Sequence, residues 1–117
     1  MTQHELKKRT KEFAVRIVNF IDTLPNNRKG WTVGDQLIRS GTSVGANYRA
    51  ACRSKTKPTF IHKIGIVEEE ADESVFWLEL LEECKLGDET EHAALLKEAN
   101  ELTAIFTATS KSIAGKN

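Results

Sequence analysis

The chain has 117 residues, of which 39% are apolar and 29% are charged, a composition typical of a globular protein and not of a disordered one. No window approaches 18 uncharged apolar residues, and the first residues lack the apolar stretch of a signal peptide. We therefore expect a cytoplasmic protein without a membrane span. The formal net charge is zero, which excludes a strongly basic or strongly acidic chain.

The charge is nevertheless divided unevenly along the chain. Residues 1–63 carry 13 Lys/Arg and 4 Asp/Glu, a balance of +9, and residues 64–117 carry 4 Lys/Arg and 13 Asp/Glu, a balance of −9. Helices of the first half could pair with helices of the second half through complementary charges. The alternative is a basic face for nucleic acid or an acidic face for a basic partner.

The first predicted helix covers residues 3–23. Thr2 and Glu5 fit a capping box, and apolar residues recur from Leu6 at spacings of three and four. Pro25 ends the helix, because the residue before a proline disfavours the helical conformation.

The second predicted helix covers residues 33–53, with Thr32 as its N-cap candidate. It is unusually rich in small residues. Gly41 and Gly45 lie four positions apart and therefore on one face. Because each interior glycine costs about 1 kcal/mol relative to alanine, we expect a neighbouring helix to approach closely there.

The third predicted helix covers residues 58–85, with Pro58 in its first turn and Gly87 as the expected C′ residue. The fourth begins near residues 88–90 and ends near 113. Cys52 and Cys84 fall within helical patterns, so we expect reduced and mostly buried thiols. Four amphipathic helices with short loops predict an all-α, antiparallel up-down four-helix bundle, forming one domain over residues 1–117.

The sequence offers little support for chemistry. Glu89 and His92 form a Glu-x-x-His pair, but a di-iron bundle needs two such pairs, and His4 and His62 lack the matching Glu. Serines of the second helix have no histidine on that helix. We therefore predict no enzyme, no catalytic residue, no cofactor and no metal.

A polar stripe on the second helix faces the acidic third helix if the two fold back near residues 55–57. This register places Arg39 level with Glu73, so that Arg39 and Asn47 could bond carboxylates of the third helix. The predicted structural network consists of Gln36, Arg39, Ser43, Asn47, Glu69, Glu70 and Glu73, and Ser40 belongs to the same stripe.

Two basic clusters are candidates for contact with phosphate. One consists of Arg49, Arg53, Lys55, Lys57 and Lys63, around the connector between the second and third helices. The other consists of Lys7, Lys8, Arg9 and Lys11. No helix-turn-helix spacing, RNA-recognition motif or zinc framework accompanies them.

The middle of the chain resembles the 23S rRNA intervening-sequence protein family. The resemblance rests on Gln36-Leu-Ile-Arg39, on Ser43 to Arg53, on Phe60-Ile61, on Gly65 to Ser74 and on Trp77 to Leu81. Ala50-Ala51 stands where many members carry an acidic residue and a glycine. The resemblance implies a bacterial, cytosolic four-helix bundle that forms ring-like homo-oligomers, notably pentamers.

We therefore predict a non-enzymatic, homo-oligomeric interaction or accessory protein of unidentified process and protein partner. Trp31, Phe76 and Trp77 provide more aromatic surface than a thin core requires, which favours a subunit contact. The alternative is an RNA- or DNA-binding accessory protein that uses the basic cluster around the connector.

Overall fold

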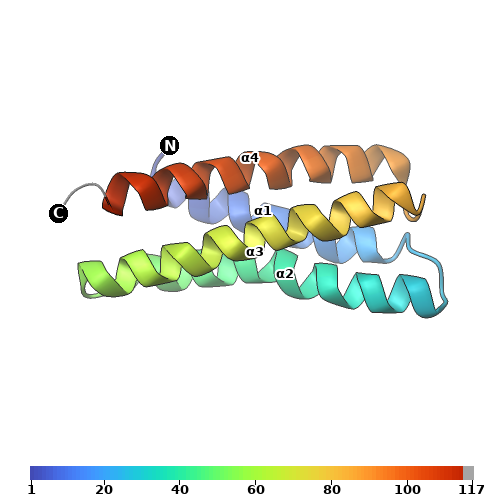
Figure 1. Cartoon of the computed structure of the whole chain (residues 1–117), viewed down its shortest axis with the longest axis horizontal. Helices are drawn as coiled ribbons and strands as arrows, with labels where there is room; N and C mark the ends of the chain where they lie inside the picture. The colour runs from blue at the N-terminus through green and yellow to red at the C-terminus, as the bar shows by residue number, and fades with distance from the viewer. Residues whose placement is uncertain (115–117) are drawn as a thin grey trace.

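The computed structural model describes residues 1–114 and confirms the antiparallel up-down four-helix bundle (Figure 1). Its helices are α1 (Gln3–Ile21), α2 (Arg28–Cys52), α3 (Lys57–Glu83) and α4 (Glu89–Ala114). The molecule measures 48 × 22 × 21 Å. Contacts are extensive in the pairs α1–α2, α2–α3 and α3–α4 and much sparser between α1 and α4, so the bundle has one thin seam.

Two N-caps show how local sequence sets the helix starts. Thr2 Oγ1 accepts a hydrogen bond from the Glu5 backbone N–H at 3.1 Å, as expected, and also donates to the Glu5 carboxylate. The predicted start of the second helix was wrong: α2 begins five residues earlier, where Asn27 Oδ1 accepts from the Gly30 N–H. A glycine in this first turn is required because an added Cβ would lie 1.9 Å from the Pro25 carbonyl oxygen.

The end of α3 also differs from the prediction. The C′ residue is Lys85, with φ of +56°, and not Gly87. The Lys85 N–H bonds to the Glu82 carbonyl and the Leu86 N–H to the Leu81 carbonyl, which is the hydrogen-bond pattern of a Schellman motif. Gly87 has φ of +89° and lies where a Cβ would meet the Phe20 ring at 2.7 Å, so a glycine is needed for packing as well as conformation.

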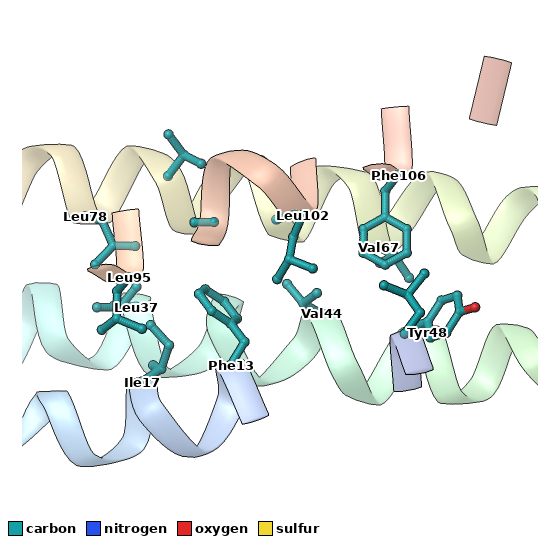
Figure 2. Close-up of a cluster of buried hydrophobic side chains, with 14 of the residues drawn as sticks. Phe13, Ile17, Leu37, Val44, Tyr48, Val67, Leu78, Leu95, Leu102 and Phe106 are labelled. Carbon is teal, nitrogen blue, oxygen red and sulfur yellow. The ribbon is translucent and has the colours of Figure 1, made fainter. Parts of the chain in front are cut away.

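The core runs along the bundle axis and consists of aliphatic and aromatic side chains from all four helices (Figure 2). At one end the Tyr48 and Phe106 rings pack with centroids 5.4 Å apart. The largest fully buried members are Phe13, Phe20, Phe106, Ile17, Leu37, Ile64, Leu78, Leu81, Leu95 and Leu102.

The small residues of α2 bring α1 close, as the sequence predicted. A Cβ at Gly45 would lie 3.1 Å from the Thr10 carbonyl oxygen, so the two backbones nearly touch. A Cβ at Gly41 would lie 2.9 Å from the Ile17 side chain. The distance between α1 and α2 is therefore set by these two glycines.

Both cysteines are free thiols. Cys52 is half-buried, but Cys84 is exposed, contrary to expectation, because α3 ends at Glu83 and leaves Cys84 as its C-cap. Within residues 1–114, no helix has an apolar stretch long enough to cross a bilayer.

Candidate functional site: a basic groove between helices α1 and α2

A groove of about 650 Å³ runs along the outer side of the α1–α2 pair. Its floor is formed by small residues, because α1 and α2 approach so closely at Gly45. Its walls are basic. The lining residues are His4, Lys7, Lys8, Lys11 and Ala14 from α1 and Thr42, Gly45, Ala46, Arg49, Cys52 and Arg53 from α2.

Most cations of this groove lack an anionic partner. In the part of the chain that the structure describes, no ion pair or hydrogen bond involves the side chains of Lys7, Lys11, Arg49 or Arg53. Lys8 lies 4.0 Å from Glu12, but both side chains are mostly exposed, so this pair neutralises little. The groove is therefore a concentrated positive surface.

Three arginines outside the groove, Arg9, Arg16 and Arg39, are paired across the two halves of the chain. Arg9 forms a bidentate pair with Glu98, with both N–O distances 2.7 Å, and also reaches Glu101. Arg16 Nε bonds Glu91 at 2.9 Å. Complementary charge thus holds α1 against α4, while the groove lies between the two basic helices, where the acidic helices do not neutralise it.

The structure combines the two predicted basic clusters only in part. Arg49 and Arg53 line the groove, whereas Lys55, Lys57 and Lys63 do not. Lys7, Lys8 and Lys11 lie opposite the two arginines, and Arg9 turns away to α4. The spacing of residues 4, 7, 8 and 11 on one helix face was the available signal for this wall.

A buried phenol, that of Tyr48, neighbours Cys52 of the groove lining. Tyr48 is 4% exposed, and burial raises the pKa of its hydroxyl far above the ordinary value, with the neighbouring Cys52 thiol adding to the shift. Cys52 itself lines the groove.

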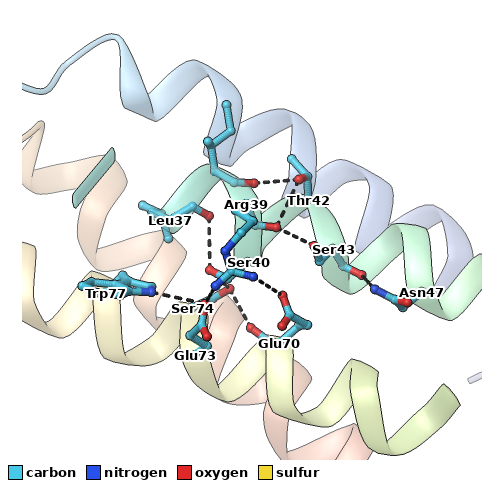
Figure 3. A network of polar contacts seen from close by, with 11 residues as sticks. Leu37, Arg39, Ser40, Thr42, Ser43, Asn47, Glu70, Glu73, Ser74 and Trp77 are labelled. Atoms are coloured by element: carbon cyan, nitrogen blue, oxygen red, sulfur yellow. Dashed lines mark hydrogen bonds and ion pairs between the residues drawn. The ribbon is translucent and has the colours of Figure 1, made fainter. Parts of the chain in front are cut away.

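On the opposite side of α2, the predicted polar network is present in a smaller form (Figure 3). Arg39 lies between two carboxylates of α3, with Nη1 3.2 Å from Glu70 Oε2 and Nη2 in contact with Glu73 Oε2. The prediction for Asn47 was wrong, because its Nδ2 donates to the Ser43 carbonyl of its own helix at 2.9 Å. Within residues 1–114, Gln36 and Glu69 take no part in the network.

A buried serine pair lies beneath these ion pairs. Ser43 Oγ donates to the Arg39 carbonyl of its own helix, whereas Ser74 Oγ of α3 donates to Ser40 Oγ at 3.0 Å. Ser74 was not among the residues predicted for the polar network, so the sequence analysis missed this bond. The network on this face serves to fix the α2–α3 register, and its carboxylates are occupied by Arg39.

The outer side of α3 carries large apolar side chains as well as acidic ones. Phe76 is 54% exposed and packs edge-on against Trp77, with ring centroids 4.9 Å apart. Ile66 and Leu80 are half-buried on the same side. Trp31, the other exposed aromatic residue, is 57% exposed and donates to Asn26 at the α1–α2 turn. We call Ile66, Phe76, Trp77 and Leu80 the α3 stripe.

His92 of the Glu-x-x-His pair has a structural role. His92 is 4% exposed, and its Nε2 lies 2.5 Å from the Leu78 carbonyl oxygen, to which it donates. Residues 1–114 hold no cluster of three or more His, Cys, Asp or Glu side chains arranged for a metal ion.

Fold and surfaces together define an all-α bundle protein with a basic groove on one side and an apolar stripe on another. Residues 2–108 match the model of the 23S rRNA-intervening sequence protein family, and the chain belongs to this family.

A solved structure supports the assignment. It is the 1.70 Å crystal structure of a protein with unknown function from the S23 ribosomal protein family of Bacteroides thetaiotaomicron VPI-5482. It is similar with a TM-score of 0.82 and 35% identity, over 90% of this chain and 97% of that chain. No curated protein matches this chain.

Proposed function

We propose that this chain is a non-enzymatic interaction module that assembles with copies of itself through the α3 stripe. The observation that carries this proposal is the exposure of the Phe76 ring beside Trp77 on α3. Large aromatic side chains such as these are enriched in the interfaces between protein chains. A second copy of this chain can cover the α3 stripe without the need for another protein.

The charges of the chain favour self-association over binding to a highly charged foreign protein. The whole chain is neutral, and acidic residues such as Glu69 and Asp72 are exposed on the helix that carries the α3 stripe. Residues of the basic half can face these acids in a neighbouring copy, as heterologous ring contacts require. The free thiols of Cys52 and Cys84 fit a reducing bacterial cytoplasm.

The test is solution mass by light scattering at micromolar concentration. We expect a closed oligomer, and a ring of five would have five times the 13.1 kDa mass of one chain. Phe76→Ser removes an exposed ring without opening the core, so the variant should fold and dissociate to smaller species.

Val15→Ser is the matched control, because Val15 is 52% exposed on α1, away from the α3 stripe. It should keep the oligomer. A wild-type chain that is monomeric, or an oligomer that survives Phe76→Ser, would refute assembly through this stripe.

A further inference from the structure

The basic groove has no ligand in the proposed self-association, and its charge needs an explanation. Folding gathers Lys7, Lys8, Lys11, Arg49 and Arg53 around one hollow. Like charges gathered around one hollow repel one another. The acidic half of the chain pairs with Arg9, Arg16 and Arg39 and not with these five cations. An anion from outside the chain would relieve this repulsion.

The arrangement of the cations indicates a repeating anion. On α1 the basic side chains recur at successive turns, about 5.4 Å apart along the helix axis, from His4 to Lys11. Arg53 and Arg49 form a second, antiparallel row on α2. Two rows of positive charge along a groove suit a polymer with a charge at each unit better than a single phosphate or carboxylate.

The lining also indicates which part of such a polymer is recognised. It contains no Phe, Tyr or Trp ring on which the bases of a single strand could stack, and no carboxylate or side-chain amide that could bond a base edge. Sequence-independent binding through cations alone is typical of contacts to the phosphodiester backbone.

We propose that the α1–α2 groove binds the phosphodiester backbone of a double-helical nucleic acid, without sequence specificity. The groove lies on the side of the bundle formed by α1 and α2, so binding does not require the α3 stripe or the self-association proposed above. The site differs from the cluster expected from sequence, because Lys7, Lys8 and Lys11 replace Lys55, Lys57 and Lys63.

The experiment compares two double variants that remove the same charge. Arg49→Gln with Arg53→Gln changes the groove, and Lys55→Gln with Lys63→Gln changes exposed or half-exposed basic residues outside it. Binding of a labelled hairpin RNA and of a labelled duplex DNA is measured by fluorescence anisotropy over a series of salt concentrations, with folding checked by circular dichroism.

We expect the wild type to bind at low salt, with log affinity falling steeply against log salt concentration. The groove variant should lose about tenfold in affinity or more, and its salt slope should fall by about 2, one for each phosphate contact removed. The control variant should keep the wild-type slope. Comparing the affinity for the hairpin RNA with that for the duplex DNA distinguishes a preference for A-form helices from binding to any duplex.

Three results would overturn the proposal. One is the absence of binding to both duplexes at low salt. Another is an equal loss in the two variants, which would show diffuse charge attraction and not a site. The third is a groove variant whose oligomer dissociates while nucleic-acid binding is unaffected. This result would show that the groove contacts the acidic surface of a second copy.

Discussion

The hydroxyls of Ser40 and Ser74 meet 3.0 Å apart at the centre of the α2–α3 interface, where both residues are 0% exposed. Each also contacts a carbonyl of its own helix, Ser40 that of Leu37 and Ser74 that of Glu70. The pair therefore joins two helices at one register without leaving a buried hydroxyl unsatisfied.

Replacing either serine by alanine should lower the free energy of unfolding by about 1 kcal/mol, since the remaining hydroxyl keeps its own carbonyl. The double variant should cost less than the sum of the two, with a coupling energy of at least about 0.5 kcal/mol. Urea denaturation of the four proteins measures this cycle. Strict additivity would show that the interhelical bond contributes nothing to stability.

Gly41 and Gly65 should respond in opposite ways to alanine. At Gly41 the added Cβ would lie 2.9 Å from the stiff, buried Ile17 side chain, so Gly41→Ala should destabilise the bundle by about 1–3 kcal/mol. At Gly65 no atom lies within 4 Å of the added Cβ, and Gly65→Ala should stabilise α3 by about 0.5–1 kcal/mol. Thermal melts measure both, and changes of the same sign would contradict the packing described for α1 and α2.

The thin α1–α4 seam should depend on Arg9. Its bidentate pair with Glu98 involves side chains only 25% and 17% exposed, so it is better shielded than an ordinary surface ion pair. Arg9→Lys cannot form both bonds and should cost about 1 kcal/mol. Amide hydrogen exchange should accelerate near the start of α1 and leave the middle of α3 unchanged. Uniform acceleration in all helices would show that the seam does not open separately.

The burial of the Tyr48 phenol should make the folded protein less stable in alkali. Burial raises the pKa of its phenol, so above the ordinary tyrosine value of about 10 the unfolded chain loses this proton before the folded chain does. The free energy of unfolding should therefore fall as the pH rises beyond that value. Tyr48 is the only tyrosine, so phenolate absorbance reports its titration directly.

Tyr48→Phe is the matched control, because it keeps the ring packed near Phe106 and removes the titrating group. Its alkaline loss of stability should be shallower than that of the wild type, measured by thermal melts across the same pH range. Equal slopes for the two proteins would assign the loss to lysine titration elsewhere.

Helical periodicity was sufficient to predict the four helices and most of the core, because burial of one face is a local property of the sequence. It was insufficient at the start of α2. The sequence alone suggests that Gly30 lies outside a helix, and only the close approach of the Pro25 carbonyl in the α1–α2 turn explains why a glycine stands in the first turn. Lys85 likewise takes a positive φ that the sequence would assign to the nearby Gly87.

The candidate groove was less predictable than the fold. Lys11 and Arg49 are 38 positions apart, and no spacing rule states that two basic clusters will face the same hollow. The same limitation hid the buried contact between Ser40 and Ser74, since each serine alone is compatible with exposure. Arg39 was easier to place, because its carboxylate partners follow directly from the helix register.

The near-contact of the α1 and α2 backbones at Gly45 has a consequence for the energetics of any complex. Helices held this closely cannot widen or narrow the hollow between them, so the walls are preorganised and only the long lysine and arginine side chains must be immobilised. Binding should therefore proceed as rigid-body docking, with an association rate governed by electrostatic steering and without a slow conformational step.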